Sequence, residues 1–383
     1  MVEFVNYTSY RIQLESPGST LGMIVVFLII VSVMTCKRER PEFLDKRLSV
    51  NARGFAILCV ILGHFATKCV AERTVFVGCG YLGVVLFLFL SGYGVHRRYG
   101  AVRLGWDFWA RRLVRIYPAL WLSLVLFAVL DRVLIDLHHP GWELAVNFLG
   151  VHFNGALVRV NSASWFVGFL IWQYVLYFLV SYLRVGEFVK VGVLVVLGCG
   201  TLAVVAFSCL KAYLGIWGHY VFVYPVGVLA SLVQGGRAAA RGEFALGNAG
   251  ALAILASVCL VFGLLGWAEP FLRWFRLLVG VPIALVFVYA LVWFGFVSRF
   301  LEVLGKYSYE MFLMHLPFMV KYDFFLYRKP TCLFFFVYLF CVLFWGWLLR
   351  GISEGFSAGV RWAGGKIWAG VLGCRHGREV GGG

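Results

Sequence analysis

Long apolar runs recur along the whole chain, and they restrict its fold more than any other feature. Hydrophobic residues make up 62% of the 383 residues and charged residues only 14%, and the mean hydropathy is +0.88. The runs approach the ~20 residues that a helix needs to cross a bilayer. Because backbone groups in lipid must be hydrogen-bonded internally, such runs fold as helices. We therefore expect an all-α, polytopic membrane helical bundle.

The positions of the runs predict about 10–11 transmembrane helices and no soluble domain. Residues 1–47 would form an outer N-terminal segment, an extra first span and a basic loop. Residues 48–352 would form the main membrane domain, and residues 353–383 a Gly-rich basic tail. The predicted spans are 21–36, 50–70, 80–96, 117–135, 163–184, 189–209, 213–233, 246–267, 277–297, 304–322 and 331–352. Gly218 and Pro225 predict a broken helix in the seventh span.

The distribution of Lys and Arg predicts how the chain lies in the membrane. Alternate loops form two sets, and the set that includes the C-terminal tail carries about twice as many Lys and Arg residues as the other. The richer set should face the cytoplasm, which places the N-terminus outside and the C-terminus inside. The net charge of +16 then comes from basic cytoplasmic loops, which are attracted to anionic lipid. We expect no nucleic-acid partner.

Two ionisable residues, Arg53 and His64, lie in one predicted span, joined by the apolar stretch GFAILCVILG. On a helix, eleven steps rise about 16 Å and complete about three turns, so the two side chains share a face. Ionisable residues inside a membrane are costly and usually functional. An imidazole near the midplane can accept a proton from a hydroxyl. Taken alone, Arg53 is more typical of a snorkelling cation at a helix end.

A second cationic group lies in the stretch WDFWARRLVRIYP, which contains Arg111, Arg112 and Arg115. Their spacing of three or four residues allows all three to face one direction on a helix. Two interpretations are equally compatible with this pattern. One is an amphipathic helix in the membrane plane that binds lipid headgroups. The other is a platform that binds phosphate groups through bidentate arginine contacts.

Glu310 and His315 enter the predicted span 304–322. Five residues apart on a helix, their side chains point about 140° apart, so they should not share a face. We expect Glu310 to pair with an Arg of another helix, and His315 to line the same cavity as His64. A polar network that only holds helices together is an equal alternative.

Three further residues are candidates for a site. Ser91 is followed by Gly92, and two small residues allow close approach by another helix or a ligand. Trp165 at the outer end of its span and Gln173 within it fit either membrane anchoring or the wall of an acceptor site.

We expect the adjacent His138 and His139 to be solvated loop residues. The cysteines form no CxxC pair and no metal-ligand spacing, so we expect no metal.

Together, five segments resemble the acyltransferase-3 family of integral membrane O-acyltransferases. They occur in family order between residue 48 and about residue 350. The Arg-x10-His pattern alone is moderately specific, whereas the ordered set is strongly specific. The chain departs from the family in having Asn51-Ala52 before Arg53 and a span ahead of the domain. The matching segments are Arg53-Gly54 through His64, Gly80 through Gly92, Arg111 through Pro118, Ser164-Trp165-Phe166, and Leu304 through His315.

The resemblance implies that an acyl group, usually acetyl from acetyl-CoA, is transferred to a hydroxyl of an extracytoplasmic glycan or glycolipid. It implies that His64 is the catalytic residue and Arg53 its companion. It places Arg111, Arg112 and Arg115 at the coenzyme end, and we assign Ser91 to that end as well. Acyl-CoA would be a co-substrate, with no bound cofactor. The expected partners are acyl-CoA, the acceptor and membrane lipids, and the expected location is the plasma membrane, the bacterial inner membrane above all.

A transporter or flippase of an amphiphile or glycolipid is the alternative function. Such a protein shares the many spans, the broken helices and a polar midplane. It would need no coenzyme, so consumption of a thioester separates the two functions.

Overall fold

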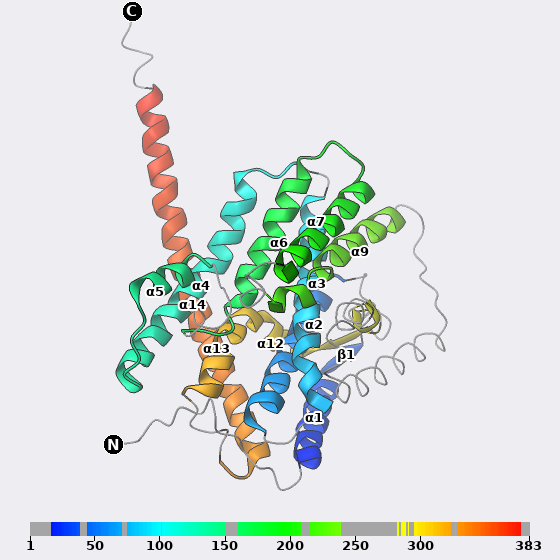
Figure 1. The fold of residues 1–383 in the computed structure, drawn as a ribbon, viewed down its shortest axis with the longest axis vertical. Helices are drawn as coiled ribbons and strands as arrows, with labels where there is room; N and C mark the ends of the chain where they lie inside the picture. The colour runs from blue at the N-terminus through cyan, green and yellow to red at the C-terminus, as the bar shows by residue number, and fades with distance from the viewer. Residues whose placement is uncertain are drawn as a thin grey trace, which may run out of the picture.

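The computed structural model describes most of the chain as helices with short connections (Figure 1). The described residues are 17–38, 44–70, 75–100, 102–150, 160–207, 215–238, 282, 285–288, 290, 295–322, 326 and 328–376. Within them, five helices are long and apolar enough to cross a membrane, and two shorter apolar helices accompany them. These features confirm the predicted helical membrane bundle.

The elements follow one another in a simple order, and nearly all are helices. The helices are α1 (Pro17–Met34), α2 (Lys46–His64), α3 (Cys79–Tyr99), α4 (Trp106–Leu134), α5 (Gly141–Phe148), α6 (Trp165–Ser181), α7 (Glu187–Phe207), α9 (Val223–Ala238), α12 (Arg299–Lys306), α13 (Ser308–Val320) and α14 (Thr331–His376). Single turns are η1 (Phe65–Cys69), η2 (Val75–Gly78) and η4 (Gly215–His219), and the strands are β1 (Cys36–Arg38) and β2 (Phe296–Ser298).

The helix boundaries agree with most predicted spans and differ from three. The predicted span 213–233 is broken, as expected, between η4 and α9. The span 304–322 is instead two short helices, because Tyr307 leaves the helical conformation between α12 and α13. Helix α4 begins eleven residues before the predicted span 117–135, and α14 continues past the predicted boundary at residue 352 to His376. The predicted span 246–267 lies outside the described residues, as does most of 277–297.

Helix α2 is the central element of the bundle. In its apolar window 72% of the residues are buried, compared with 17% in α7. It packs against α3, α12 and α13. Helices such as α1 and α7 instead leave large apolar side chains exposed, among them Phe27, Ile30, Phe188 and Val196. This distribution is the one expected of a bundle whose outer helices face lipid tails.

Two glycines of α2 allow neighbouring backbones to touch it. A Cβ added at Gly54 would overlap the carbonyl of Leu301 in α12, and one added at Gly63 would overlap the backbone of Gly80 in α3. Small residues permit this close packing in membrane helices. Gly92 of α3 likewise meets the backbone of Tyr224 in α9, so the close approach expected there is to another helix.

A two-stranded antiparallel ribbon joins segments that are far apart in the sequence. β1 pairs with β2, with Cys36 opposite Ser298 and Lys37 opposite Val297. The Asn51 side chain of α2 accepts a hydrogen bond from the Ser298 N–H (2.8 Å), and Ser298 also caps α12. The ribbon therefore ties the end of α1 to α2 and to the start of α12.

We expect the substitution Gly54→Ala to destabilise the protein by about 1–3 kcal/mol, because the added methyl group is forced into the α12 backbone. Gly94→Ala is the matched control, since no atom lies within 4 Å of a Cβ placed there. It should leave stability unchanged or raise it, because Ala favours helix more than Gly does. The midpoint of thermal aggregation of both variants in detergent measures the difference. Equal midpoints would contradict the close α2–α12 contact.

Candidate functional site

A large open cavity lies between the N-terminal half of α2 and the helices around it. Its volume is about 1770 Å³. It is lined by the end of α1 with β1, the first two turns of α2, the early turns of α4, β2, α12, the start of α13, and the middle of α14. The break between α12 and α13 contributes Ser308, Tyr309 and Glu310 to the wall. A cavity of this size accommodates a large organic ligand.

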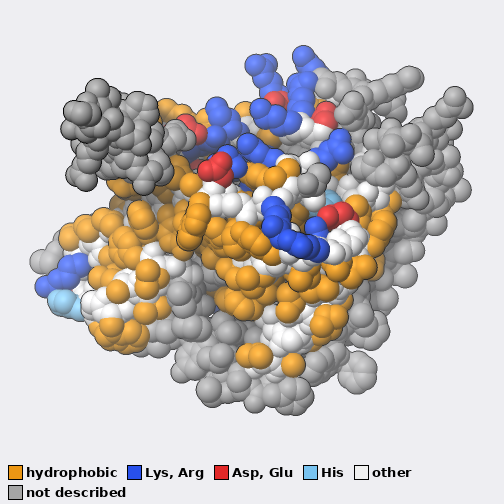
Figure 2. Space-filling view, turned by 90° about the horizontal axis from the view of Figure 1, so that it is seen from above, with side chains coloured by type: hydrophobic (Ala, Val, Ile, Leu, Met, Phe, Trp, Pro, Cys, Tyr) orange, Lys and Arg blue, Asp and Glu red, His pale blue; other side chains and the backbone are white. Residues whose placement is uncertain are grey.

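The cavity lining is strongly basic. Nine of its residues are Lys or Arg and three are Glu. Two of the three acids are already paired, Glu302 with Arg47 (3.6 Å) and Glu354 with Arg350 (2.8 Å). Figure 2 shows the molecule from the end toward which α14 projects, where Lys and Arg side chains gather beside few acidic ones. The nine basic residues are Lys37, Lys46, Arg47, Arg53, Arg111, Arg115, Arg299, Lys306 and Arg350.

Arg53 points into this cavity from α2. Its Nε donates a hydrogen bond to the Ser49 carbonyl one turn earlier (3.2 Å). Arg115, Arg350 and Glu310 lie close enough to interact electrostatically with it. Glu310 is buried, at 8% exposure, and Arg350 and Arg115 lie close enough to influence it electrostatically. No ion pair joins it to an arginine among the described residues, so the expected pairing stays a prediction. Arg350 was not predicted. Its signal is a lone cation at the end of the apolar run of α14.

The three arginines in the first half of α4 separate into two environments. Arg111 and Arg115 line the cavity. The Arg112 guanidinium lies instead over the rings of Tyr99, Phe108 and Tyr174, at 5.2–5.7 Å from their centroids. The segment is neither a loop nor a separate in-plane helix, because α4 is continuous from Trp106 to Leu134. Arg112 points toward α3 and α6, so only two of the three arginines, Arg111 and Arg115, share the face that was expected for all three.

His64 lies at the other end of α2, against His315. The two ring centroids are 5.2 Å apart. The helix changes from α to π geometry directly after His64, in η1, and such changes are frequent at functional sites. His64 is partly buried and is not among the residues that line the basic cavity. Ten residues of unbroken helix separate it from Arg53, and the eleven steps between them rise about 16 Å.

His315 is completely buried and has a defined tautomer. Its Nδ1 lies 2.6 Å from the Phe312 carbonyl, which can only accept, so Nδ1 carries the proton. Nε2 is then an acceptor in the neutral ring, and within the described residues it has no hydrogen-bond partner. Glu310 and His315 face different surroundings, as their spacing predicts. Glu310 lines the cavity, and His315 packs against His64.

The remaining predicted residues lie away from the cavity. Ser91 Oγ hydrogen-bonds to the Tyr174 hydroxyl (2.9 Å). Trp165 stacks on Tyr220, with ring centroids 5.6 Å apart. Gln173 is buried in α6, and its Nε2 has no partner among the described residues. These residues are therefore associated with α6 and its neighbours, whereas Arg53, Arg111, Arg115 and Glu310 are brought together.

A buried charged cluster occupies the opposite end of α4. Asp131 is fully buried and accepts hydrogen bonds from Lys321 Nζ (2.8 Å) and from the Tyr322 hydroxyl. His139 Nε2 lies 2.7 Å from the same carboxylate, and its Nδ1 lies 3.5 Å from Glu143. The expectation that His139 is solvated is wrong, because these partners bury its side chain. An acid within the apolar run of α4 is the signal that could have revealed the cluster.

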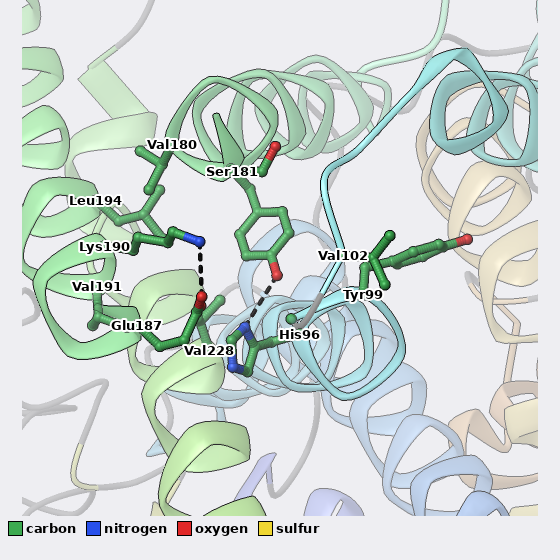
Figure 3. Close-up of a pocket in the computed structure, with 12 residues that line it drawn as sticks. His96, Tyr99, Val102, Val180, Ser181, Glu187, Lys190, Val191, Leu194 and Val228 are labelled. Atoms are coloured by element: carbon green, nitrogen blue, oxygen red, sulfur yellow. Dashed lines mark hydrogen bonds and ion pairs between the residues drawn. The ribbon is translucent and has the colours of Figure 1, made fainter. Parts of the chain in front are cut away.

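A second, small pocket lies near the ends of α3, α6 and α7 (Figure 3). His96 Nδ1 and the Tyr177 hydroxyl are hydrogen-bonded across it (3.0 Å), and Lys190 donates to Glu187 (2.7 Å). Its volume of about 10 Å³ is enough for about one water molecule. It therefore cannot hold a substrate.

Comparison with known proteins gives one result. The family model of an acyltransferase domain, acyltransferase-3, matches residues 47–351, which is most of the chain. The match runs from the first turn of α2 into α14 and includes Arg53, His64 and most of the basic cavity residues. Searches among curated proteins and among solved structures gave no match. The chain therefore belongs to the acyltransferase-3 family and is a membrane acyltransferase.

Proposed function

We propose that the protein is an O-acyltransferase, and specifically an O-acetyltransferase that uses cytosolic acetyl-CoA. The acceptor is a hydroxyl of an extracytoplasmic glycan or glycolipid. One observation carries the proposal: a basic cavity holds Arg53, and the helix that bears Arg53 ends at His64 beside a second histidine. The membrane is the plasma membrane, with the N-terminus outside and the cavity end and C-terminus in the cytoplasm.

The charges of the cavity match the donor. Coenzyme A carries a diphosphate and a 3′-phosphate, and phosphate oxygens are well suited to bidentate arginine contacts. Arg111 and Arg115 offer such contacts from α4, and Arg53 and Arg350 complete the group from α2 and α14. Exposed side chains in the lining, including Arg111 at 48%, leave the cavity accessible to a ligand from solution.

The distance between the cavity and His64 suits the shape of the donor. Moving charged phosphates into the apolar interior costs much free energy, so they would stay in the basic cavity. The pantetheine arm is long and flexible, and it would carry the thioester along α2 toward His64. The acceptor would approach from the opposite end.

His64 would act directly on the reacting groups. As a general base it would take the proton of the acceptor hydroxyl while the oxygen attacks the thioester carbonyl, and it would return that proton to coenzyme A, which leaves as the thiolate when the C–S bond breaks. Alternatively, its ring nitrogen would attack the thioester carbonyl and release coenzyme A, and the acceptor hydroxyl would then attack the acyl-imidazole, take the acyl group and lose its proton to the freed ring. In either case His315 would position the His64 ring, because its own tautomer is set by the Phe312 carbonyl and its Nε2 has no hydrogen-bond partner in the part of the chain that the structure describes.

We expect His64→Ala to reduce acetyl transfer by at least about 10²-fold, the usual contribution of a general base, while the protein still inserts and folds. The assay supplies labelled acetyl-CoA to membrane vesicles and measures both label in surface glycans and free coenzyme A. His138→Ala is the matched control, because His138 is exposed and remote from the cavity. Full transfer by His64→Ala would remove His64 from the mechanism. An intact thioester with wild-type vesicles would favour a transporter.

We expect Arg115→Ala to weaken coenzyme A binding about 10- to 100-fold, since a charged hydrogen bond contributes about 1.5–3 kcal/mol. Arg111→Ala should act in the same direction. Arg97→Ala is the control, because Arg97 is exposed at the end of α3 and does not line the cavity. Calorimetric titration of the purified variants with coenzyme A measures the change. Unchanged affinity in Arg115→Ala would show that the phosphates bind elsewhere.

A further inference from the structure

Part of the cavity wall comes from a segment that precedes the family match. The match begins at residue 47, whereas Met34, Thr35, Cys36 and Lys37 all line the cavity. Met34 ends α1, Thr35 connects it to β1, and Cys36 and Lys37 belong to β1. The N-terminal segment is thus an addition to the acyltransferase domain, and it contributes directly to the cavity.

The segment is held in place by specific contacts. Besides the β1–β2 pairing, Thr35 Oγ1 hydrogen-bonds to Ser298 Oγ (2.8 Å), and the Arg299 N–H donates to the Thr35 carbonyl (3.1 Å). Helix α1 packs on α14, where the rings of Phe27 and Phe336 lie 4.6 Å apart. The wall that carries Lys37 is therefore a defined surface of the cavity.

Lys37 is the basic residue of this added wall. Its side chain is exposed, and within the described residues it forms no ion pair. Three further cations line the cavity from the neighbouring elements, Lys46 and Arg47 from the first turn of α2 and Arg299 from the start of α12. Of these four, Arg47 is paired with Glu302.

The cavity thus offers cations at two depths along α2. Lys46 precedes Arg53 by seven residues, which places it about 10 Å farther from His64 along the helix. Arg53, with Arg115 and Arg350 close by, forms the deeper group. A donor whose thioester points toward His64 would bring its diphosphate, which is attached to the pantetheine arm, to the deeper group. The 3′-phosphate at the adenosine end would lie farther out.

We propose that Lys37, on the added N-terminal segment, binds the 3′-phosphate of the coenzyme A donor together with Lys46 and Arg299. The proposal rests on acyl-CoA being the donor, as proposed above. A lysine ammonium serves such a phosphate as a compact positive charge. The segment would then raise affinity for the intact coenzyme over its 3′-dephospho form.

The test compares two ligands with two proteins. Wild-type protein and Lys37→Gln, in nanodiscs of neutral phosphatidylcholine, are titrated with coenzyme A and with 3′-dephospho-coenzyme A. We expect Lys37→Gln to bind coenzyme A about tenfold more weakly, the effect of one charged hydrogen bond, and to bind the dephospho form as wild-type does. Arg184→Gln is the control, since Arg184 is exposed and outside the cavity lining.

Three outcomes would overturn the proposal. Equal coenzyme A affinity in wild-type and Lys37→Gln would remove Lys37 from the donor site. Equal weakening of both ligands would show that Lys37 does not act through the 3′-phosphate. A Lys37→Gln effect that appears only when anionic lipid is added to the nanodiscs would assign Lys37 to a lipid headgroup. If wild-type protein binds neither ligand, the donor assignment itself fails, and that result is distinct from the other three.

Discussion

The site depends on backbone-to-backbone packing of α2 against its two neighbours. Gly54 admits the α12 backbone beside Arg53, and Gly63 admits the α3 backbone beside His64. Each proposed functional residue is therefore adjacent in sequence to a close helix contact. Dispersion contacts of this kind replace the hydrophobic driving force that is absent between helices in lipid. They hold the positions of both side chains without using any polar group of the site.

Charge is distributed unevenly between the two ends of the bundle. At the cavity end, nine cations face only three acids, so positive potential remains for an anionic ligand. At the other end, Asp131 is paired with Lys321 and lies against His139, which Glu143 also approaches, in a buried cluster. Burying such groups is tolerated only when they are paired. The excess of cations at the cavity end suits binding of an anionic ligand. The paired groups at the other end instead hold α4, α5 and α13 together.

The sequence predicted the helical class, most span positions and the placement of Arg53 and His64 on one continuous helix, because these depend on local periodicity. It also predicted that Glu310 and His315 face different surroundings. It did not predict the environment of Arg112. Whether an arginine side chain lies in a cavity or against aromatic rings depends on residues of other helices that pack around it. The same applies to His139, which is buried against Asp131, a carboxylate also bound by the sequence-remote Lys321. It applies as well to the β1–β2 ribbon, which is too short to show a strand pattern.

Helix α2 is unbroken from Lys46 to His64, and this continuity fixes the distance between the cavity and the imidazole. In the proposed mechanism, the phosphates rest at one end of a rigid rod and the reacting carbonyl must arrive at the other. The protein would then select a donor by the distance between its phosphates and its thioester as much as by its acyl group. A donor with a shortened arm would bind at the surface and yet never meet the imidazole.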